Sequence, residues 1–395
     1  MSSTLHFVGI IKIDMYMMKI IDIKNYKGFK HLALENLSRI NLFVGKNNVG
    51  KSSLLEAISI LCHKYNVPDY IFRNRNELLR SNEDGDQLCY RWLFPGFSDE
   101  VSEENKIEIS SKEDGASASV SLQFTYYTTV EIRNSEGEIE LQKKMIEGYQ
   151  VPQDGQVYKK GMRIKTNDGV NNLHIFHPPF NISTSTYHQD GRVILRGSLR
   201  LQAIHKPCEY IQPSELTRID NSGRFDAISV AGKEAFVIEA LQIFNPDIEQ
   251  LIYVGSPLRI PYVKLKGTEE KVPLRSMGDG INRVLTIVLA MIQCENDGVL
   301  LIDEFENGLH YTVQYQLWKI IYRLAEQLNI QVFVTSHSID TLRGLSKLIS
   351  DYPEDEMKEK VACYYLQNTK DNVIKSYRYD AANFEFLINQ GEEIR

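Results

Sequence analysis

The sequence predicts an α/β fold with a mostly parallel core sheet, an antiparallel β-rich insertion and a helical lobe. The continuous apolar runs at residues 298–302 and 330–334 are typical of parallel strands buried on both faces, and residues 311–328 between them have helical periodicity. Residues 99–205 instead show short alternating runs separated by turn residues, which indicates antiparallel strands. Helical periodicity returns at residues 232–251. We therefore expect the two ends of the chain to form one sheet, with the insertion and the lobe looped out between them.

This pattern divides the chain into six expected segments. They are an N-terminal tail (1–17), the first half of the core domain (18–98), the β-rich insertion (99–205), the helical lobe (206–275), the second half of the core domain (276–345) and a C-terminal segment (346–395). Alternating runs in the first half predict two strands with a turn between them, and helical spacing follows from Ser52. The C-terminal segment is predicted to hold a helix, a hairpin and a short helical end.

Composition limits the classes of function. With 395 residues, of which 43% are hydrophobic, the chain can bury a sizeable core. The formal net charge of −7 argues against a surface devoted as a whole to nucleic acid. Basic stretches at 159–165 and 259–266 could contact nucleic-acid phosphates, but lysines on the wet face of a strand are the commoner case.

Cysteine usage and apolar runs bear on location. The five cysteines are odd in number and scattered, with no spacing for zinc or for a disulfide framework, which fits a reducing compartment. The longest apolar runs fall short of the roughly 20 residues that span a bilayer, and the first residues lack a cleavage site for export. We predict a cytoplasmic protein without membrane contact.

A glycine-rich stretch at residues 45–52, GKNNVGKS, fits the pattern G-x-x-x-x-G-K-[ST] between a predicted strand and a predicted helix. Glycines let the backbone wrap around phosphate oxygens, so that successive amides and the helix N-terminus point at the anion. We predict that Lys51 reaches the β and γ phosphates of a nucleotide and that Ser52 offers its hydroxyl to Mg²⁺. The predicted phosphate-binding residues are Gly45, Asn47, Asn48, Val49, Gly50, Lys51, Ser52 and Ser53. An ordinary glycine turn is the alternative interpretation.

Three polar residues end the two buried strands. Asp303 and Glu304 follow the first of them, and we predict that Asp303 holds the magnesium shell while Glu304 polarises the attacking water. His337 follows the second strand and is predicted to face the γ-phosphate, where it can donate a hydrogen bond. The alternative is a solvated strand end with a structural histidine.

The order of these motifs separates families of phosphate-loop proteins. The glycine-rich loop and the acid pair lie far apart, so a large insertion interrupts the nucleotide fold, and RSMGDGINR (275–283) precedes the acid pair where the ABC-type ATPases carry their signature segment. This order resembles the ABC-like heads of the SMC, RecF and OLD proteins. INLFVGKNNVGKSSLLEAI, LLIDEFENGLH and VFVTSHSIDTL are most similar to small bacterial AAA-family ATPases related to the ATPase half of OLD nucleases. The resemblance covers residues 18 to 346.

The resemblance implies that two heads sandwich two ATP molecules. Ser276 and the amide of Gly278 would then contact the γ-phosphate held by the other subunit. The match is imperfect, because ABC signatures usually begin Leu-Ser-Gly-Gly and this chain has Arg275 and Met277 at two of those positions.

The resemblance also implies two further ligand contacts. A glutamine is expected at the magnesium site, and Gln212 is the candidate, although a glutamine before proline can simply begin a turn. An aromatic residue is expected on the adenine, for which Tyr26 and Phe29 are candidates; core packing is the other role open to both.

Several ATPases of this kind are subunits of anti-phage systems. The residues after Ser346 are too few for a TOPRIM nuclease domain, so any nuclease is expected on a separate polypeptide. The guanine-specificity pattern Asn-Lys-x-Asp is missing, which favours ATP over GTP as the nucleotide. Our leading interpretation is a Mg²⁺-dependent ATPase that forms a homodimer or a larger homo-oligomer and controls a separate effector, such as a TOPRIM-type nuclease, in anti-phage defence. The alternatives are a RecF/SMC-like DNA-repair ATPase that binds DNA directly, the nucleotide-binding subunit of a membrane transporter, and a scaffold with an inactive site.

Overall fold

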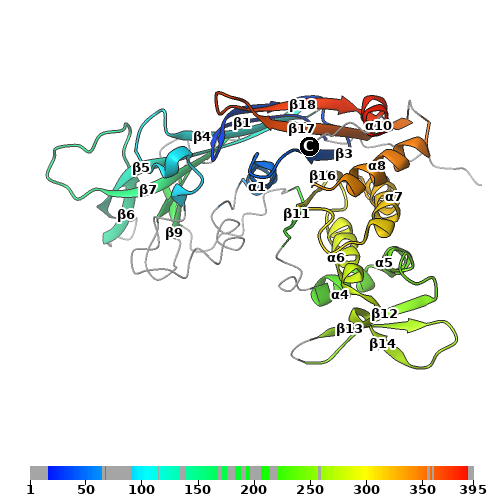
Figure 1. The fold of residues 1–395 in the computed structure, drawn as a ribbon. Helices are drawn as coiled ribbons and strands as arrows, with labels where there is room; N and C mark the ends of the chain where they lie inside the picture. Colours follow the sequence, from blue (N-terminus) through cyan, green and yellow to red (C-terminus); the bar gives the residue numbers. More distant parts are fainter. Residues whose placement is uncertain are drawn as a thin grey trace, which may run out of the picture.

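The computed structural model describes most of the chain and places it in two large sheets and a helical lobe (Figure 1). The described residues are 17–64, 67, 90–113, 115–133, 139–167, 171–175, 183–187, 193–195, 206–213, 221–256, 259–353, 356–357 and 360–389. The predicted N-terminal tail lies outside them except for residue 17.

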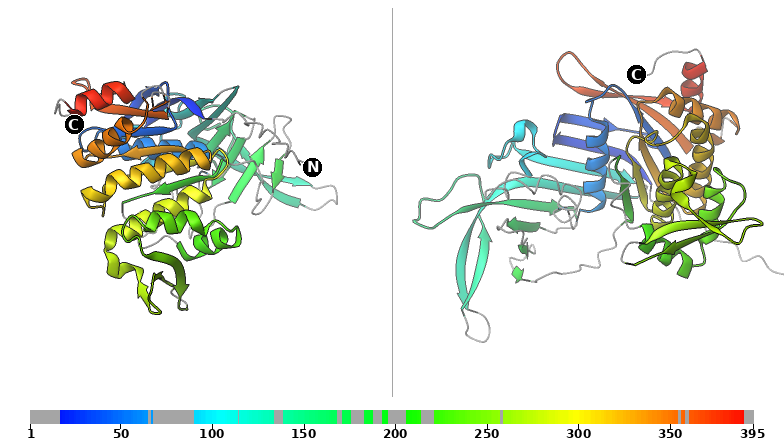
Figure 2. Two further views of the ribbon diagram at one scale, coloured as in Figure 1. Left: turned by 90° about the vertical axis from the view of Figure 1, so that its right-hand side faces the viewer. Right: turned by 60° about the horizontal axis from the view of Figure 1, so that its bottom comes forward.

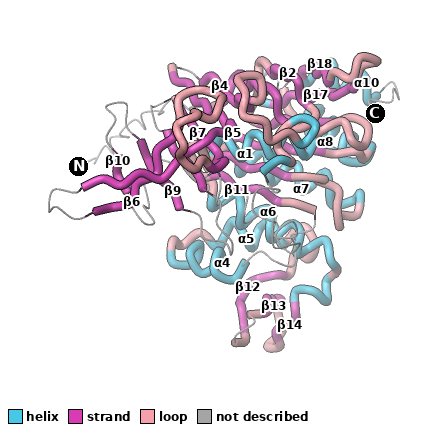
Figure 3. The backbone as a smooth tube through the Cα atoms, turned by 90° about the vertical axis from the view of Figure 1, so that its left-hand side faces the viewer, coloured by secondary structure: helices cyan, strands magenta, loops and turns pink. Residues whose placement is uncertain are grey.

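The largest sheet is antiparallel and has nine strands in the order β10-β9-β8-β7-β5-β4-β1-β2, with β6 paired to β5. The strands are β1 (Met18–Tyr26), β2 (Phe29–Leu34), β4 (Lys106–Glu113), β5 (Ala116–Arg133), β6 (Ile139–Met145), β7 (Lys159–Thr166), β8 (Asn171–Ile175), β9 (Ser183–Tyr187) and β10 (Val193–Leu195). β1 pairs with β4, with Ile23 opposite Ile109, so strands from the predicted first half of the core and from the predicted insertion share one sheet. The outer strands of this sheet extend away from the rest of the molecule in Figure 3.

A second sheet of six strands carries the glycine-rich loop, in the order β11-β15-β16-β3-β17-β18. Its strands are β3 (Ile40–Val44), β11 (Cys208–Ile211), β15 (Val299–Ile302), β16 (Gln331–Thr335), β17 (Val361–Asn368) and β18 (Ile374–Asp380). All neighbours are parallel except β17 and β18, which form an antiparallel hairpin. The strand ends that follow β3, β11, β15 and β16 therefore lie at one edge of this sheet.

The expectation of a mostly parallel core sheet does not hold for the chain as a whole. The largest sheet is antiparallel, and parallel pairing is confined to the six-stranded sheet. The reason lies in β1 and β2, which pair antiparallel with each other, and β1 pairs antiparallel with β4 of the insertion instead of extending the parallel sheet.

Helix α1 (Lys51–Cys62) lies between the two large sheets, touching β4 and β5 of one and β11, β15 and β16 of the other. It is apolar on most of its surface, and nine of its twelve residues are buried. Strand β15 is buried on both faces, as its continuous apolar sequence indicates: Val299 and Leu301 join the core around α1, whereas Leu300 and Ile302 face the opposite core.

Helices cover the other face of the six-stranded sheet and continue into a lobe (Figure 2). They are α6 (Asp279–Gln293), α7 (Tyr311–Gln327), α8 (Ile339–Ser350) and α10 (Ala381–Asn389) on the sheet, and α4 (Asn221–Val230) and α5 (Glu234–Leu241) in the lobe. The lobe also holds a small sheet of β12 (Ile248–Val254), β13 (Ile260–Leu265) and β14 (Lys271–Pro273). Two short 3₁₀ turns complete the elements, η2 (Pro95–Phe97) and η4 (Leu274–Met277). Within the described residues, helices are too short or too polar to cross a membrane.

Candidate functional site

The glycine-rich loop joins the end of β3 to the start of α1 and has an unusual backbone. Gly45, Asn48 and Gly50 have φ of 147°, 62° and 94°. A Cβ on Gly45 would lie 2.4 Å from the carbonyl oxygen of Leu366, and a Cβ on Gly50 would lie 2.8 Å from the ring of Phe29. Both positions therefore combine a left-handed conformation with a close approach that only glycine tolerates. No side chain caps the N-terminus of α1, so its first amides stay free for an anion.

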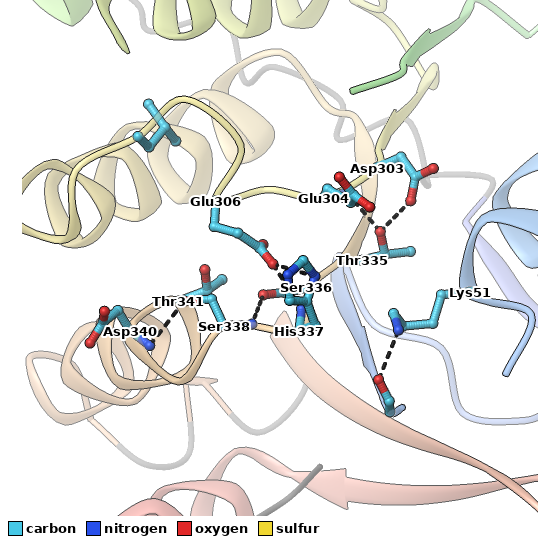
Figure 4. A network of polar contacts seen from close by, with 12 residues as sticks. Lys51, Asp303, Glu304, Glu306, Thr335, Ser336, His337, Ser338, Asp340 and Thr341 are labelled. Atoms are coloured by element: carbon cyan, nitrogen blue, oxygen red, sulfur yellow. Dashed lines mark hydrogen bonds and ion pairs between the residues drawn. The ribbon is translucent and has the colours of Figure 1, made fainter. Parts of the chain in front are cut away.

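The ammonium group of Lys51 is folded back onto this loop. Only 9% of the residue is exposed, and Nζ donates hydrogen bonds to the carbonyl oxygens of Gly45 at 2.8 Å and Lys46 at 3.0 Å. Burial lowers the pKa of Lys51 below its ordinary value. Three carboxylates of the turn after β15 act on the same pKa in the opposite direction, those of Asp303, Glu306 and Glu304. The cation and these carboxylates therefore belong to one site, with more negative than positive charge (Figure 4).

The remaining loop residues differ in exposure. Asn47, Asn48 and Ser52 are exposed, Ser53 is half-buried, and Val49 is 4% exposed. The two asparagines and Ser52 thus lie open to solvent at the rim of the loop, whereas Val49 packs in the core around α1.

Asp303 follows β15 and is held by two hydroxyl groups from neighbouring strands. It is 5% exposed, its Oδ1 accepts a hydrogen bond from Thr335 Oγ1 at 2.5 Å, and its Oδ2 accepts one from Tyr210 OH at 3.4 Å. The backbone N–H of Glu304 donates to the same Thr335 hydroxyl at 2.9 Å. Glu304 has φ of 49°, so the chain turns sharply after Asp303. Sequence analysis missed Thr335, although a hydroxyl residue directly before Ser336-His337 at the end of a buried strand was a usable signal.

His337 is exposed and is held by a residue that sequence analysis did not single out. Its backbone N–H donates to Oε1 of Glu306 at 2.9 Å, and its ring Nδ1 lies 2.9 Å from the same oxygen. Glu306 belongs to the quoted LLIDEFENGLH segment, and its position beyond the acid pair gave no local sign of this contact. The imidazole and the carboxylates of Asp303 and Glu304 come from neighbouring parallel strands, β16 and β15.

Gln212 lies at the same edge of the sheet, directly after β11. It is half-buried, and its carbonyl oxygen accepts a hydrogen bond from Arg283 Nη1 at 3.3 Å. Arg283 is fully buried in α6, and its Nη2 donates to the carbonyl oxygens of Asp303 at 2.8 Å and Glu304 at 3.2 Å. Burial lowers the pKa of Arg283 to about 10, against the opposing effect of nearby carboxylates. Arg283 therefore ties α6 and the segment after β11 to the acid pair, a role that sequence analysis missed.

The signature-like turn lies before α6. Ser276 is exposed in η4 and its Oγ donates to the carbonyl oxygen of Pro273 at 2.7 Å, while Gly278 is exposed with φ of 102°. Within the described part of this chain, the hydrogen bonds of Ser276 do not reach the glycine-rich loop. Ser276 and Gly278 of this turn are thus both exposed to solvent.

Tyr26 and Phe29 pack in the core, which was one of the two roles open to them. They are 0% and 1% exposed. The ring of Phe29 packs against Gly50, and Tyr26 OH donates a hydrogen bond to Glu56 at 3.0 Å. Neither ring offers a face to a nucleotide base.

The oxygen donors at this edge suit a magnesium ion that arrives with a nucleotide. Among the described residues, clusters of three or more His, Cys, Asp or Glu side chains able to hold a metal by themselves are absent. Mg²⁺ usually keeps several waters and binds one or two protein oxygens together with substrate phosphates. The carboxylate of Asp303 and the exposed hydroxyl of Ser52 provide such a donor set, and the surplus of carboxylates over Lys51 fits a divalent cation.

Comparison with known proteins places the chain in a family. Residues 17–189 and 212–341 match the AAA ATPase domain family. An ATP/GTP phosphatase of Helicobacter pylori is 25% identical over an alignment that covers 96% of this chain and 100% of that protein. The DNA replication and repair protein RecF of Bacillus mycoides is 36% identical over 64 residues, 16% of each chain. An SMC head bound to the C-terminal winged-helix domain of ScpA is 11% identical, with a TM-score of 0.47 and coverage of 92% of this chain and 97% of that one. Because the family match spans most of the chain and includes both halves of the site, the chain belongs to the AAA ATPase domain family and is an ATPase.

Proposed function

We propose that the chain hydrolyses MgATP at the edge of the six-stranded sheet, between the glycine-rich loop and the turn after β15. The observation that carries this proposal is the electrostatic connection of buried Lys51 to the carboxylates of Asp303, Glu304 and Glu306. The free amides at the start of α1 and Lys51 bind the β and γ phosphates. Asp303, Ser52 and Gln212 would hold the magnesium ion, which would neutralise charge on the phosphates.

Glu304 is proposed to act on the attacking water. Glu304 is half-buried and directly follows the proposed magnesium ligand Asp303. Its carboxylate would therefore lie near the reacting phosphate and would not coordinate the metal. His337, from the next strand, is proposed to donate to the γ-phosphate.

The test is ATP hydrolysis by purified wild-type protein beside Lys51→Ala and Glu304→Gln, with Glu270→Gln as the matched control at an exposed position in the lobe. We expect Lys51→Ala to lose ATP binding and Glu304→Gln to bind ATP but turn over at least about 100-fold more slowly. Glu270→Gln should equal wild type. Equal rates in all four proteins would refute the site.

We further propose that ATP binding joins two chains, with Ser276 and Gly278 of one chain facing the nucleotide of the other. The exposed position of this turn supports the proposal. The ATP-bound dimer or larger homo-oligomer then controls a separate effector protein, such as a TOPRIM-type nuclease, in anti-phage defence.

Light scattering of Glu304→Gln with ATP should give at least twice the monomer mass, and Ser276→Arg should abolish this increase in mass. A monomer under all nucleotide conditions would exclude this arrangement.

A RecF/SMC-like ATPase that binds DNA directly is the second candidate, and one surface favours it. Lys106 lies on β4 and Arg163 and Lys165 lie on β7, the two strands that flank β5, and Arg163 and Lys106 both pair in register with Gln123 of β5. Burial lowers the pKa of Lys165, and the positive charges of Arg163 and Lys106 lower it further. The three cations therefore lie close enough to interact. Both basic surfaces also hold ion pairs, Lys106 with Glu108 and Arg259 with Asp226.

Fluorescence anisotropy with a labelled DNA duplex tests this candidate. DNA binding that weakens with salt and drops in Lys165→Ala would favour it, and each lost phosphate contact should reduce the salt slope by about 1. Absence of binding at low salt, with and without ATP, would eliminate it.

A further inference from the structure

The carboxylate of Glu306 makes two contacts with a single residue, His337. Its Oε1 accepts the backbone N–H of His337 at 2.9 Å and lies 2.9 Å from ring Nδ1 (Figure 4). One oxygen atom therefore fixes both the position of the backbone and the orientation of the ring.

The burial of the two side chains is unequal. The side chain of Glu306 is 13% exposed and that of His337 is 50% exposed. The second oxygen of Glu306, Oε2, is buried and has no hydrogen-bond partner among the described residues. A buried carboxylate with an unsatisfied oxygen is costly, and within the described structure its compensating hydrogen bonds come from His337.

Further hydrogen bonds hold the backbones on either side of the pair. Glu306 lies in the turn after β15, where the N–H of Phe305 donates to the carbonyl oxygen of Thr335 at 3.0 Å and the N–H of Leu309 donates to the carbonyl oxygen of Glu306 at 2.9 Å. On the other side, Ser338 caps α8 through a hydrogen bond from the N–H of Asp340 at 3.2 Å. The remaining freedom of the imidazole is rotation about its own side-chain bonds, and the contact with Glu306 removes it.

This contact also determines which ring nitrogen Glu306 holds. A carboxylate only accepts hydrogen bonds, so Nδ1 must carry the proton that it donates to Oε1. Nε2, on the ring edge away from Glu306, is then the nitrogen that remains for a ligand. A carboxylate that holds one nitrogen of a histidine fixes what the other nitrogen presents to a ligand.

We propose that Glu306 is the positioning residue for His337: it holds the ring through Nδ1–H, so that Nε2 faces the nucleotide. The proposal deepens the proposed function and rests on it, because it assigns His337 to the ATP site. Glu304 has a separate task at the attacking water, so the two glutamates of the same turn divide orientation and proton transfer between them.

The first test reads the proton on Nδ1 directly, by ¹⁵N NMR of the full-length protein labelled at histidine, with His337→Ala to assign the signals. In wild type we expect a protonated Nδ1 for His337. Glu306→Gln keeps an acceptor oxygen and should retain this signal, whereas Glu306→Ala should lose it. An unprotonated Nδ1 in wild type, or an unchanged Nδ1 signal in Glu306→Ala, would overturn the proposal.

The second test is a double-mutant cycle in ATP hydrolysis. We expect Glu306→Ala to lower kcat at least about 10-fold with the KM for ATP changed less than about 2-fold, and His337→Ala to do the same. The double variant should be no slower than either single variant, because Glu306 acts through His337. Independent, multiplicative losses would contradict the assignment.

The two tests separate failure of this inference from failure of the proposed function. If wild type does not hydrolyse ATP, the proposed function fails, while the NMR pattern still decides whether Glu306 holds the ring. If Glu306→Ala does not fold, Glu306→Leu, of similar volume and without an acceptor, takes its place in the NMR comparison. Glu270→Gln serves as the control in both measurements and should match wild type.

Discussion

Thr335 at the end of β16 donates a hydrogen bond of 2.5 Å to the carboxylate of Asp303 at the end of β15. The same hydroxyl accepts the backbone N–H of Glu304 at 2.9 Å. One buried side chain thus fixes the proposed magnesium ligand and the turn that directs Glu304. Thr335 lies beside Asp303 because the parallel register of β15 and β16 pairs Ile302 with Val334, the residues that precede them.

Thr335→Val should keep the shape of the core but remove this hydroxyl. The N–H of Glu304 and Oδ1 of Asp303 each lose a partner in a buried place, which should cost about 1–3 kcal/mol of unfolding free energy and reduce kcat at least about 10-fold. Thr335→Ser, which keeps the hydroxyl, is the control and should retain most activity. Urea unfolding and ATP hydrolysis check both effects; a Val variant with wild-type kcat would show that the contact is dispensable.

Gly50→Ala should damage the loop through its backbone. The position has φ of 94°, and a Cβ would lie 2.8 Å from the ring of Phe29, so the loop must shift. We expect at least a 10-fold weaker affinity for a fluorescent ATP analogue, equal to about 1.4 kcal/mol or more. Gly28→Ala is the matched control, because its new Cβ would meet only Ile374 at an ordinary 3.6 Å. Equal affinities in the two variants would contradict the strain argument.

Arg283→Met should destabilise the fold by removing buried hydrogen bonds. The variant fills a similar volume but leaves the carbonyl oxygens of Gln212, Asp303 and Glu304 without their buried donor. The expected loss of unfolding free energy is about 2–4 kcal/mol. Arg343→Met, at an exposed position of α8, should change it by less than about 0.5 kcal/mol. Urea denaturation curves compare them, and a loss below 1 kcal/mol for Arg283→Met would mean that the carbonyl groups find other donors.

Cys363 in β17 should resist alkylation in the folded protein. Burial raises the pKa of this thiol above its ordinary value of 9.0, so the reactive thiolate is scarce and reagent access is blocked. At pH 8 we expect iodoacetamide to label Cys363 at least about 100-fold more slowly than in urea. In the unfolded chain the rate should level off above pH 9, whereas in the folded protein it should keep rising with pH. Peptide mass spectrometry measures both rates, and rapid native labelling would contradict the burial of β17.

Local sequence was sufficient for the parts of this protein that depend on neighbouring residues. The glycine spacing from Gly45 to Gly50, the following Lys51 and the helical periodicity after it predict the loop and α1, because backbone freedom and amphipathic period are local properties. The apolar run that ends at Asp303 likewise predicts a buried strand with a polar end.

Tertiary structure decided which distant residues meet. Nothing near His337 in the sequence indicates that Glu306 will bind it, nor that Arg283 will reach three carbonyl groups on two other segments. The pairing of β1 with β4, which makes the largest sheet antiparallel, also lay outside local reasoning, since alternation of apolar residues tells that a strand has one buried face but not which strand lies beside it. Strand partners and buried polar contacts are set by the packing of the whole chain, and the sequence records them only through residues far apart along it.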